Sequence, residues 1–210
     1  MLRWIGILLL VLVVLLGVAD FAARAFAERR VADAMQRELD LSEEPSVGIA
    51  EFPFMAAAAG GNFDSVTVEA TDVARGDLTF ARTTLTLKDV EFSLGQLLSG
   101  EHRRVSIGSG RGTARLSAED VSAALEGQGI PGQVEFRNGA VFVTSQDVEG
   151  EVEGRLAIDD GRLTVLPVAA SSSDGVELPE FGGDVTYEKV EVRGSTAVLT
   201  LTIDSRTIEL

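Results

Sequence analysis

The sequence of 210 residues predicts an α+β fold that is mostly β, in which an antiparallel meander follows one long N-terminal helix. Apolar and polar residues alternate in short runs from residue 46 to the end, and turn-forming residues separate these runs. Residues 18–41 contain neither Gly nor Pro, so nothing in them breaks a helix. The length suits one domain preceded by an N-terminal segment.

The chain begins with an uncharged apolar run from Trp4 to Ala19, which Arg3 precedes and Asp20 ends. As a helix this run covers about 24 Å, which is short of a hydrocarbon core of about 30 Å unless Phe21 and the alanines after it extend it. It is slightly longer than the apolar part of a usual secretory signal. A small-x-small cleavage site is present at residues 25–27. The sequence leaves both a cleaved signal and an uncleaved membrane anchor open.

Four arginines follow the apolar run, and only Arg3 and the amino group precede it; the four are Arg24, Arg29, Arg30 and Arg37. A strict count of positive charges would place residues 41–210 in the cytoplasm. Long domains translocate largely regardless of charge. We therefore expect residues 1–20 to serve export, and the rest of the chain to lie on the extracytoplasmic side.

Residues 21–41 are predicted to form an amphipathic helix that packs on the domain. The apolar side chains recur at helical spacing, at Ala27, Val31, Met35 and Leu39, with Ala34 on the same side. The expected organisation is a signal peptide or anchor over 1–20 and a single β-rich domain over 21–210 that includes this helix.

About eight to ten strands are expected from residue 46 onward. One of them changes its phase, since Leu78 and Phe80 alternate in one register and Leu85 and Leu87 in the other. This change predicts either a β-bulge near Thr83 or a strand that bends from one environment into another. Two hairpin turns are indicated at residues 138–139 (Asn-Gly) and 160–161 (Asp-Gly), and a third turn at residues 193–195.

Short helices are predicted between the strands. One covers Phe54–Ala59 before a Gly-Gly pair, and a further turn of helix covers Leu94–Leu98. Another begins at Ser117, because Asp120 lies three residues on and completes a pattern like a capping box.

Composition excludes several classes of function. The 33 acidic and 18 basic residues give a net charge of −15, which argues against nucleic acid as a partner. No cysteine is present, and His102, the single histidine, lies among charged residues. No nucleophile elbow, phosphate-binding loop or metal-ligand spacing is found. We therefore expect no catalytic residues, no metal and no cofactor.

One group of cations stands out from the acidic background, and it consists of Arg103, Arg104, Arg111 and Arg115. Guanidinium groups suit phosphate oxygens, so these arginines are candidates for binding a phospholipid headgroup. Pairing with surface carboxylates is the other interpretation. Tyr and Trp are nearly absent from the domain, which suits acyl chains better than sugars.

Several motifs together resemble one known family. The helix of residues 21–41 leads into Glu-Pro-Ser-Val at residues 44–47 and Phe-Pro-Phe at residues 52–54, followed by the Gly-Gly pair at residues 60–61. A hairpin with Asp-Gly-Arg-Leu at residues 160–163 comes later. This pattern is similar to the LmeA family of actinobacterial envelope proteins, over most of the chain. The Glu-Pro-Ser-Val to Phe-Pro-Phe stretch is its most specific part.

The resemblance implies an elongated antiparallel sheet, a half-barrel or barrel, that curves around the N-terminal helix and encloses an apolar groove. It implies an extracytoplasmic protein that binds phospholipids such as phosphatidylinositol and is not an enzyme. It also implies a possible role in lipid transport or in assembly of lipomannan-type glycolipids. No catalytic residues come with the family.

On this basis the inward phase of the strands is the candidate lining of the groove. The lining comprises Val66, Val68, Leu78, Phe80, Leu85, Leu87, Leu156, Ile158, Leu199 and Leu201, with Phe52 and Phe54 at one mouth. An ordinary core made of the same residues is the alternative, and composition alone favours it. Two rival functions remain open: an envelope scaffold that docks a cationic partner through its acidic face, and a metal-assisted hydrolase with clustered carboxylates.

Overall fold

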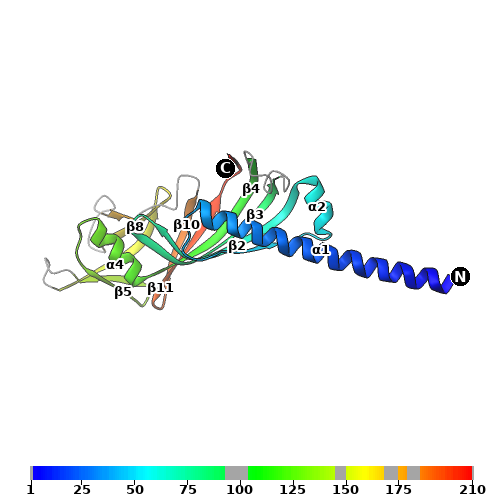
Figure 1. The fold of residues 1–210 in the computed structure, drawn as a ribbon. Helices are drawn as coiled ribbons and strands as arrows, with labels where there is room; N and C mark the ends of the chain where they lie inside the picture. Colours follow the sequence, from blue (N-terminus) through cyan, green and yellow to red (C-terminus); the bar gives the residue numbers. More distant parts are fainter. Residues whose placement is uncertain (1, 93–103, 145–149, 168–174, 179–184, 210) are drawn as a thin grey trace.

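A computed structural model describes residues 2–92, 104–144, 150–167, 175–178 and 185–209. One long helix, α1 (Leu2–Glu38), protrudes from an elongated body of strands (Figure 1). Two short helices, α2 (Phe54–Gly60) and α4 (Ala118–Gly127), lie at opposite ends of that body. The mostly β, α+β class is confirmed.

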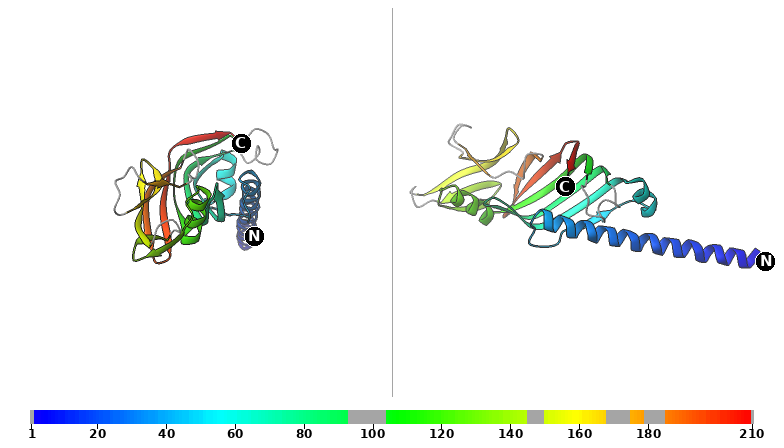
Figure 2. Two further views of the ribbon diagram at one scale, coloured as in Figure 1. Left: turned by 90° about the vertical axis from the view of Figure 1, so that its left-hand side faces the viewer. Right: turned by 45° about the horizontal axis from the view of Figure 1, so that its top comes forward.

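The larger sheet has the strand order β1-β2-β3-β4-β11-β10, and β12 pairs with β4 beyond the end of β11. All its pairings are antiparallel. Its strands are β1 (Ser46–Ile49), β2 (Asn62–Arg75), β3 (Leu78–Glu91), β4 (Arg104–Ser117), β10 (Thr186–Arg193), β11 (Thr196–Ile203) and β12 (Arg206–Glu209). The sheet is curved and, over the described residues, does not close on itself, so the half-barrel form is confirmed (Figure 2).

The smaller sheet has the order β5-β6-β7-β8-β9 and is also antiparallel. Its strands are β5 (Gln133–Arg137), β6 (Ala140–Thr144), β7 (Glu151–Asp159), β8 (Arg162–Pro167) and β9 (Val176–Glu177). β10 of the larger sheet contacts β7 and β8 of the smaller one. The described residues thus hold more strands than the eight to ten predicted, because β1, β9 and β12 are too short to show an alternation.

The predicted change of phase in β3 is confirmed. The pairing of β2 with β3 skips Asp72 opposite Ala81, and Asp72 has a φ of 49°. The register is the same on both sides of this pair, so the strand bends there without a one-residue β-bulge. Phe80 on one side of this break and Leu85 on the other therefore both face the interior. A second break lies at Asp89, which has a φ of 51° and faces Gly108 of β4. These irregularities let long strands keep one apolar face turned inward while the sheet bends.

Local signals identified the turns and the α4 cap. Asn138 and Gly139 have φ values of 53° and 83°, as a type I′ hairpin turn requires, and Asp160-Gly161 forms the second such turn. Ser117 and Asp120 form a reciprocal capping box at the start of α4. The predicted helical turn at 94–98 lies outside the described residues.

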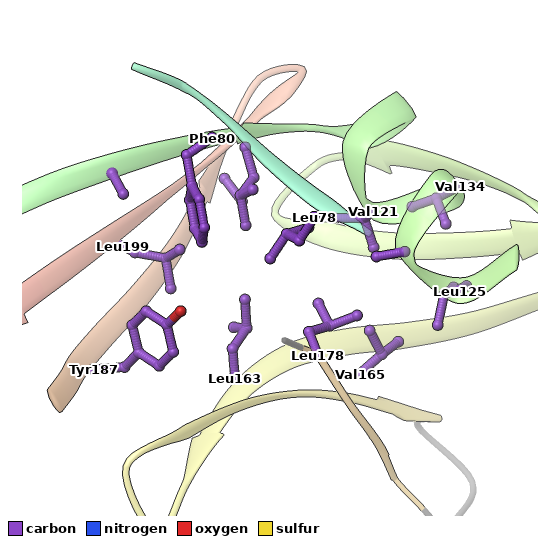
Figure 3. Packing of buried hydrophobic residues seen from close by; sticks show 14 of the residues in the cluster. Leu78, Phe80, Val121, Leu125, Val134, Leu163, Val165, Leu178, Tyr187 and Leu199 are labelled. Carbon is purple, nitrogen blue, oxygen red and sulfur yellow. The ribbon is translucent and has the colours of Figure 1, made fainter. Parts of the chain in front are cut away.

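Two apolar clusters stabilise the body. The first joins the inner face of the larger sheet to α4 and the smaller sheet, and includes Phe80, Leu116, Val121, Leu163 and Leu199 (Figure 3). The second joins α1 and α2 to β1 and β2, and includes Ala27, Ile49, Phe54 and Phe63. Of the predicted helix face, Ala27, Val31 and Met35 pack into this second cluster, whereas Leu39 lies past the end of α1 and is exposed.

Candidate functional site

Two rows of apolar residues cross the inner face of the larger sheet. Residues that pair directly across strands point to the same side of a sheet, so the pairing defines each row. The first row runs Val47, Val68, Leu85, Gly112, Leu201, Tyr187, and the second runs Ile49, Val66, Leu87, Gly110, Ile203. Val47 and Ile49, at one end of the rows, belong to the cluster beneath α1. At the other end Tyr187 belongs to the cluster at the smaller sheet, and Ile203 is buried. We call the pair of rows the inner apolar rows.

In each of the inner apolar rows, the residue that β4 contributes is a glycine. A Cβ atom on Gly110 would lie 3.0 Å from Cδ2 of Leu87 and 3.0 Å from Cβ of Ile203. On Gly112 it would lie 2.5 Å from Cδ2 of Leu85. The side chains of Leu87 and Leu85 therefore pack over Gly110 and Gly112. Because these two positions of β4 have no side chain, the sheet has room to bend there.

The predicted lining residues fall into three groups. Leu78, Phe80, Leu199 and Leu201 have no exposed surface and belong to the cluster at the smaller sheet. The first three converge on residues of the smaller sheet and α4 (Figure 3). Phe54, Val66 and Val68 are buried in the cluster beneath α1. The third group, Leu85, Leu87, Leu156 and Ile158, is only half-buried.

Only the half-buried group has surface left to give to a ligand in this conformation. Leu85 and Leu87 lie at the middle of the inner apolar rows, between the two clusters. Leu156 lines an open pocket of about 450 Å³ between the two sheets, together with Val190 and Val192 of β10. Neither valine was among the predicted site residues, although the alternation in residues 187–193 placed both on one face.

Charged side chains border this pocket. Glu191 forms ion pairs with Lys189 and Arg193, and Arg193 also lines the pocket. Hydrogen bonds first from Lys189 and then from Arg193 hold the pKa of the Glu191 carboxyl below its usual value. The rim is thus ionic, and the side chains deeper between the sheets are apolar.

The arginines predicted for a headgroup do not meet at one point. Arg111 and Arg115 are exposed on the outer face of β4, because Gly110, Ala114 and Leu116 take the inner phase. Arg104 lies seven residues before Arg111, or about 23 Å along a strand. Arg103 lies outside the described residues.

Arg104 lines a separate pocket of about 320 Å³ beside α2. Asn62, Glu91, Phe92 and Ser106 also line it, with the C-terminal residues of α2. Phe92 stacks on Phe63 with ring centroids 4.6 Å apart, which joins this pocket to the cluster beneath α1. The pocket thus places one guanidinium group, one carboxylate and polar side chains next to an apolar layer.

One buried carboxylate was missed by the sequence-based prediction. Asp20 is 7% exposed, and its oxygens accept hydrogen bonds from the backbone N–H groups of Phe54 at 2.9 Å and Met55 at 2.8 Å. It therefore caps the start of α2 from another helix, where Pro53 supplies no side-chain cap. The sequence shows only that Asp20 ends the apolar run, and nothing in the residues around it predicts a contact with the start of α2.

The predicted mouth residues have separate environments. Phe54 is buried, whereas Phe52, two residues earlier, is 82% exposed.

Among the described residues there is no group of three or more His, Asp or Glu side chains that could hold a metal ion. His102 lies outside them.

The described body is thus an α+β half-barrel with an apolar inner face, of a kind suited to bind an apolar ligand. The model of the LmeA-like phospholipid-binding family matches residues 18–204. Because this match covers most of the chain, the protein belongs to that family. Neither the curated proteins nor the solved structures gave a match.

Proposed function

We propose that the protein is an extracytoplasmic phospholipid-binding protein of the cell envelope that holds acyl chains against the inner apolar rows. Membership of a phospholipid-binding family is the observation that carries this proposal. The half-buried side chains of Leu85 and Leu87 in these rows support the location, since burying them further against an acyl chain is favourable. Leu156 and Ile158 of β7 add half-buried apolar surface on the smaller sheet.

The headgroup is assigned to the pocket at Arg104. A guanidinium group donates paired hydrogen bonds to phosphate oxygens, and Asn62 and Ser106 add polar partners for a headgroup. Arg104 is also in the outer phase of β4, because Val105 and Ile107 take the inner phase there, but it lies beside α2. Arg111 and Arg115 are less suitable because they do not line that pocket. Phosphatidylinositol is the lipid that we propose first, because its hydroxylated headgroup can use those polar side chains.

The cellular role follows from the class of ligand. A member of a phospholipid-binding family with a partly open apolar inner face is suited to hold or hand over a lipid. We place this activity in lipid transport or in the assembly of lipomannan-type glycolipids.

The test is lipid mass spectrometry of the full chain, purified after export and extracted with organic solvent. We expect phospholipid at a stoichiometric level. Arg104→Gln should lower the retained phospholipid about tenfold, because a charge-assisted hydrogen bond contributes about 1.5–3 kcal/mol. Arg115→Gln is the matched control on the same strand and should leave the lipid content unchanged.

A folded protein that carries no phospholipid, and takes up none from vesicles, would overturn the proposal. It would then favour the scaffold function. Equal losses in the two arginine variants would retain lipid binding but remove the assignment of the headgroup to the pocket at Arg104.

A further inference from the structure

The end of the body that carries α2 is bound directly to the apolar part of α1. Trp4 and residues 6–19 of α1 are exposed to solvent. Among the described side chains of α1, Asp20 is the first that is buried. Through its two hydrogen bonds, Asp20 holds the start of α2 against α1 at the point where the apolar run ends. Within the described residues, α1 is the one helix long and apolar enough to cross a membrane.

Exposed apolar side chains gather at this junction. Phe52 is 82% exposed and Met55 is 56% exposed, and Phe21 of α1, next to Asp20, is 72% exposed. We define the α2 tip as the exposed residues Phe52, Pro53, Met55, Ala56 and Ala59. In water such side chains have no evident partner, whereas a bilayer surface would cover them.

Charge also distinguishes the α2 tip from the rest of the protein. Residues 52–63 contain no charged side chain, although the net charge of the chain is −15. Most of the surface is therefore repelled by anionic headgroups, but the α2 tip is not. In two views α2 lies at the end of the body nearest the protruding half of α1 (Figures 1 and 2).

We propose that α1 is retained as a membrane anchor and that the α2 tip enters the surface of the same bilayer. The body is then held at two points, and the pocket at Arg104, which the last residues of α2 line, opens at the level of the headgroups. Cleavage after Ala27 would remove both Asp20 and a buried residue of the cluster beneath α1. This inference does not depend on which lipid, if any, the inner apolar rows hold.

The test uses the full chain reconstituted into vesicles of phosphatidylcholine and phosphatidylglycerol. The protein has no cysteine, so Met55→Cys can carry a single environment-sensitive NBD fluorophore. Ser195→Cys is the matched control, since this exposed residue lies in the turn next to the far end of β4, roughly 40 Å from Arg104. Trp4, the single tryptophan, reports insertion of α1 in every sample.

Nitroxide-labelled lipids should quench the fluorophore at residue 55 at least twofold more than the one at residue 195, and its emission should shift to the blue. Ala59→Cys repeats the measurement at a second position in the α2 tip, in case the label at residue 55 disturbs the capped turn. The intact mass of the exported protein should include residues 1–27.

Three outcomes would overturn the inference. Equal quenching at residues 55 and 195, with Trp4 quenched by brominated lipid, would show that the tip stays in water. A blue shift without quenching, lost when the protein is diluted in excess lipid, would show that a second copy covers the tip. A mature chain that begins after residue 27 would show that α1 is a cleaved signal.

Discussion

The carboxylate of Asp20 accepts a hydrogen bond at 2.9 Å from the backbone N–H group of Phe54, which lies 34 residues later in the chain. A second bond reaches the next residue, so one side chain of α1 satisfies two backbone donors at the start of α2. Since Asp20 is buried, no solvent can readily replace it.

We predict that Asp20→Ala lowers the free energy of unfolding by about 1–3 kcal/mol, because it leaves buried donors without acceptors. Asp20→Asn should restore part of the loss, since its carbonyl oxygen can accept a bond. Urea unfolding of the full chain in detergent measures both. Asp33→Ala, 13 residues further along α1, is the control, and a loss of the same size there would contradict this role of Asp20.

Glycine in β4 lets this strand pack closely against β3. A Cβ atom on Gly112 would lie 2.3 Å from the backbone carbonyl oxygen of Thr84, which cannot rotate away. Gly112→Ala should therefore destabilise the fold by about 1–3 kcal/mol. Gly48→Ala is the control, because nothing lies within 4 Å of the added atom. Similar midpoints of thermal unfolding for both variants would show that the sheet tolerates the crowding.

A buried hydroxyl lies at the phase change of β3. Oγ1 of Thr83 has no hydrogen-bond partner among the described residues. Thr83→Val keeps the shape and removes the unpaired group, so we expect a gain of about 1 kcal/mol. The adjacent Thr84→Val, on the outer face, should not stabilise the protein. Loss of stability on Thr83→Val would indicate that the hydroxyl has a partner in solution.

The pocket between the sheets is expected to take part in lipid binding. Leu156→Trp fills space beside Val190 and Val192 and should reduce bound phospholipid severalfold in a protein that remains folded. Val152→Trp is the matched control, four residues earlier on β7 and in the same phase, but exposed. Lipid mass spectrometry measures the bound phospholipid, and circular dichroism shows whether each variant is folded. An unchanged lipid content in folded Leu156→Trp would place the acyl chains elsewhere.

Glu191 should contribute little to stability despite its two ion pairs. The hydrogen bonds from Lys189 and Arg193 hold the pKa of its carboxyl below the usual 4.5, but the side chain keeps 36% of its surface in solvent, which screens both pairs. Any contribution is therefore present above pH 4.5 and is lost as the pH falls through the lowered pKa. We expect Glu191→Gln to leave the unfolding midpoint at pH 7 unchanged, in low and high salt. A clear drop that vanishes below pH 4 would show a stronger pair than we infer.

Local chemistry explains why many elements could be predicted. Ser117 with Asp120, and Asn138 with Gly139, act on their own neighbours, so the α4 cap and the hairpin turn follow from a few adjacent residues. The change of phase between Phe80 and Leu85 was visible for the same reason, since alternation is a property of one strand.

The candidate site depends on contacts that no single strand contains. Phe80 and Leu85 both alternate correctly, yet Phe80 is fully buried while Leu85 keeps exposed surface, because the smaller sheet and α4 cover only part of the inner face. Likewise Arg104 and Arg111 lie on one strand, but only Arg104 reaches the pocket beside α2.

The sequence by itself determined the fold class, the phase of the long strands, the turns and the family, because these follow from periodicity, turn chemistry and motifs along the chain. Only the tertiary structure decided which apolar residues remain open to a ligand, which arginine lies beside α2, and that Asp20 caps α2. Those properties depend on distances between segments far apart in the chain, and the packing of α1, α4 and the two sheets sets those distances.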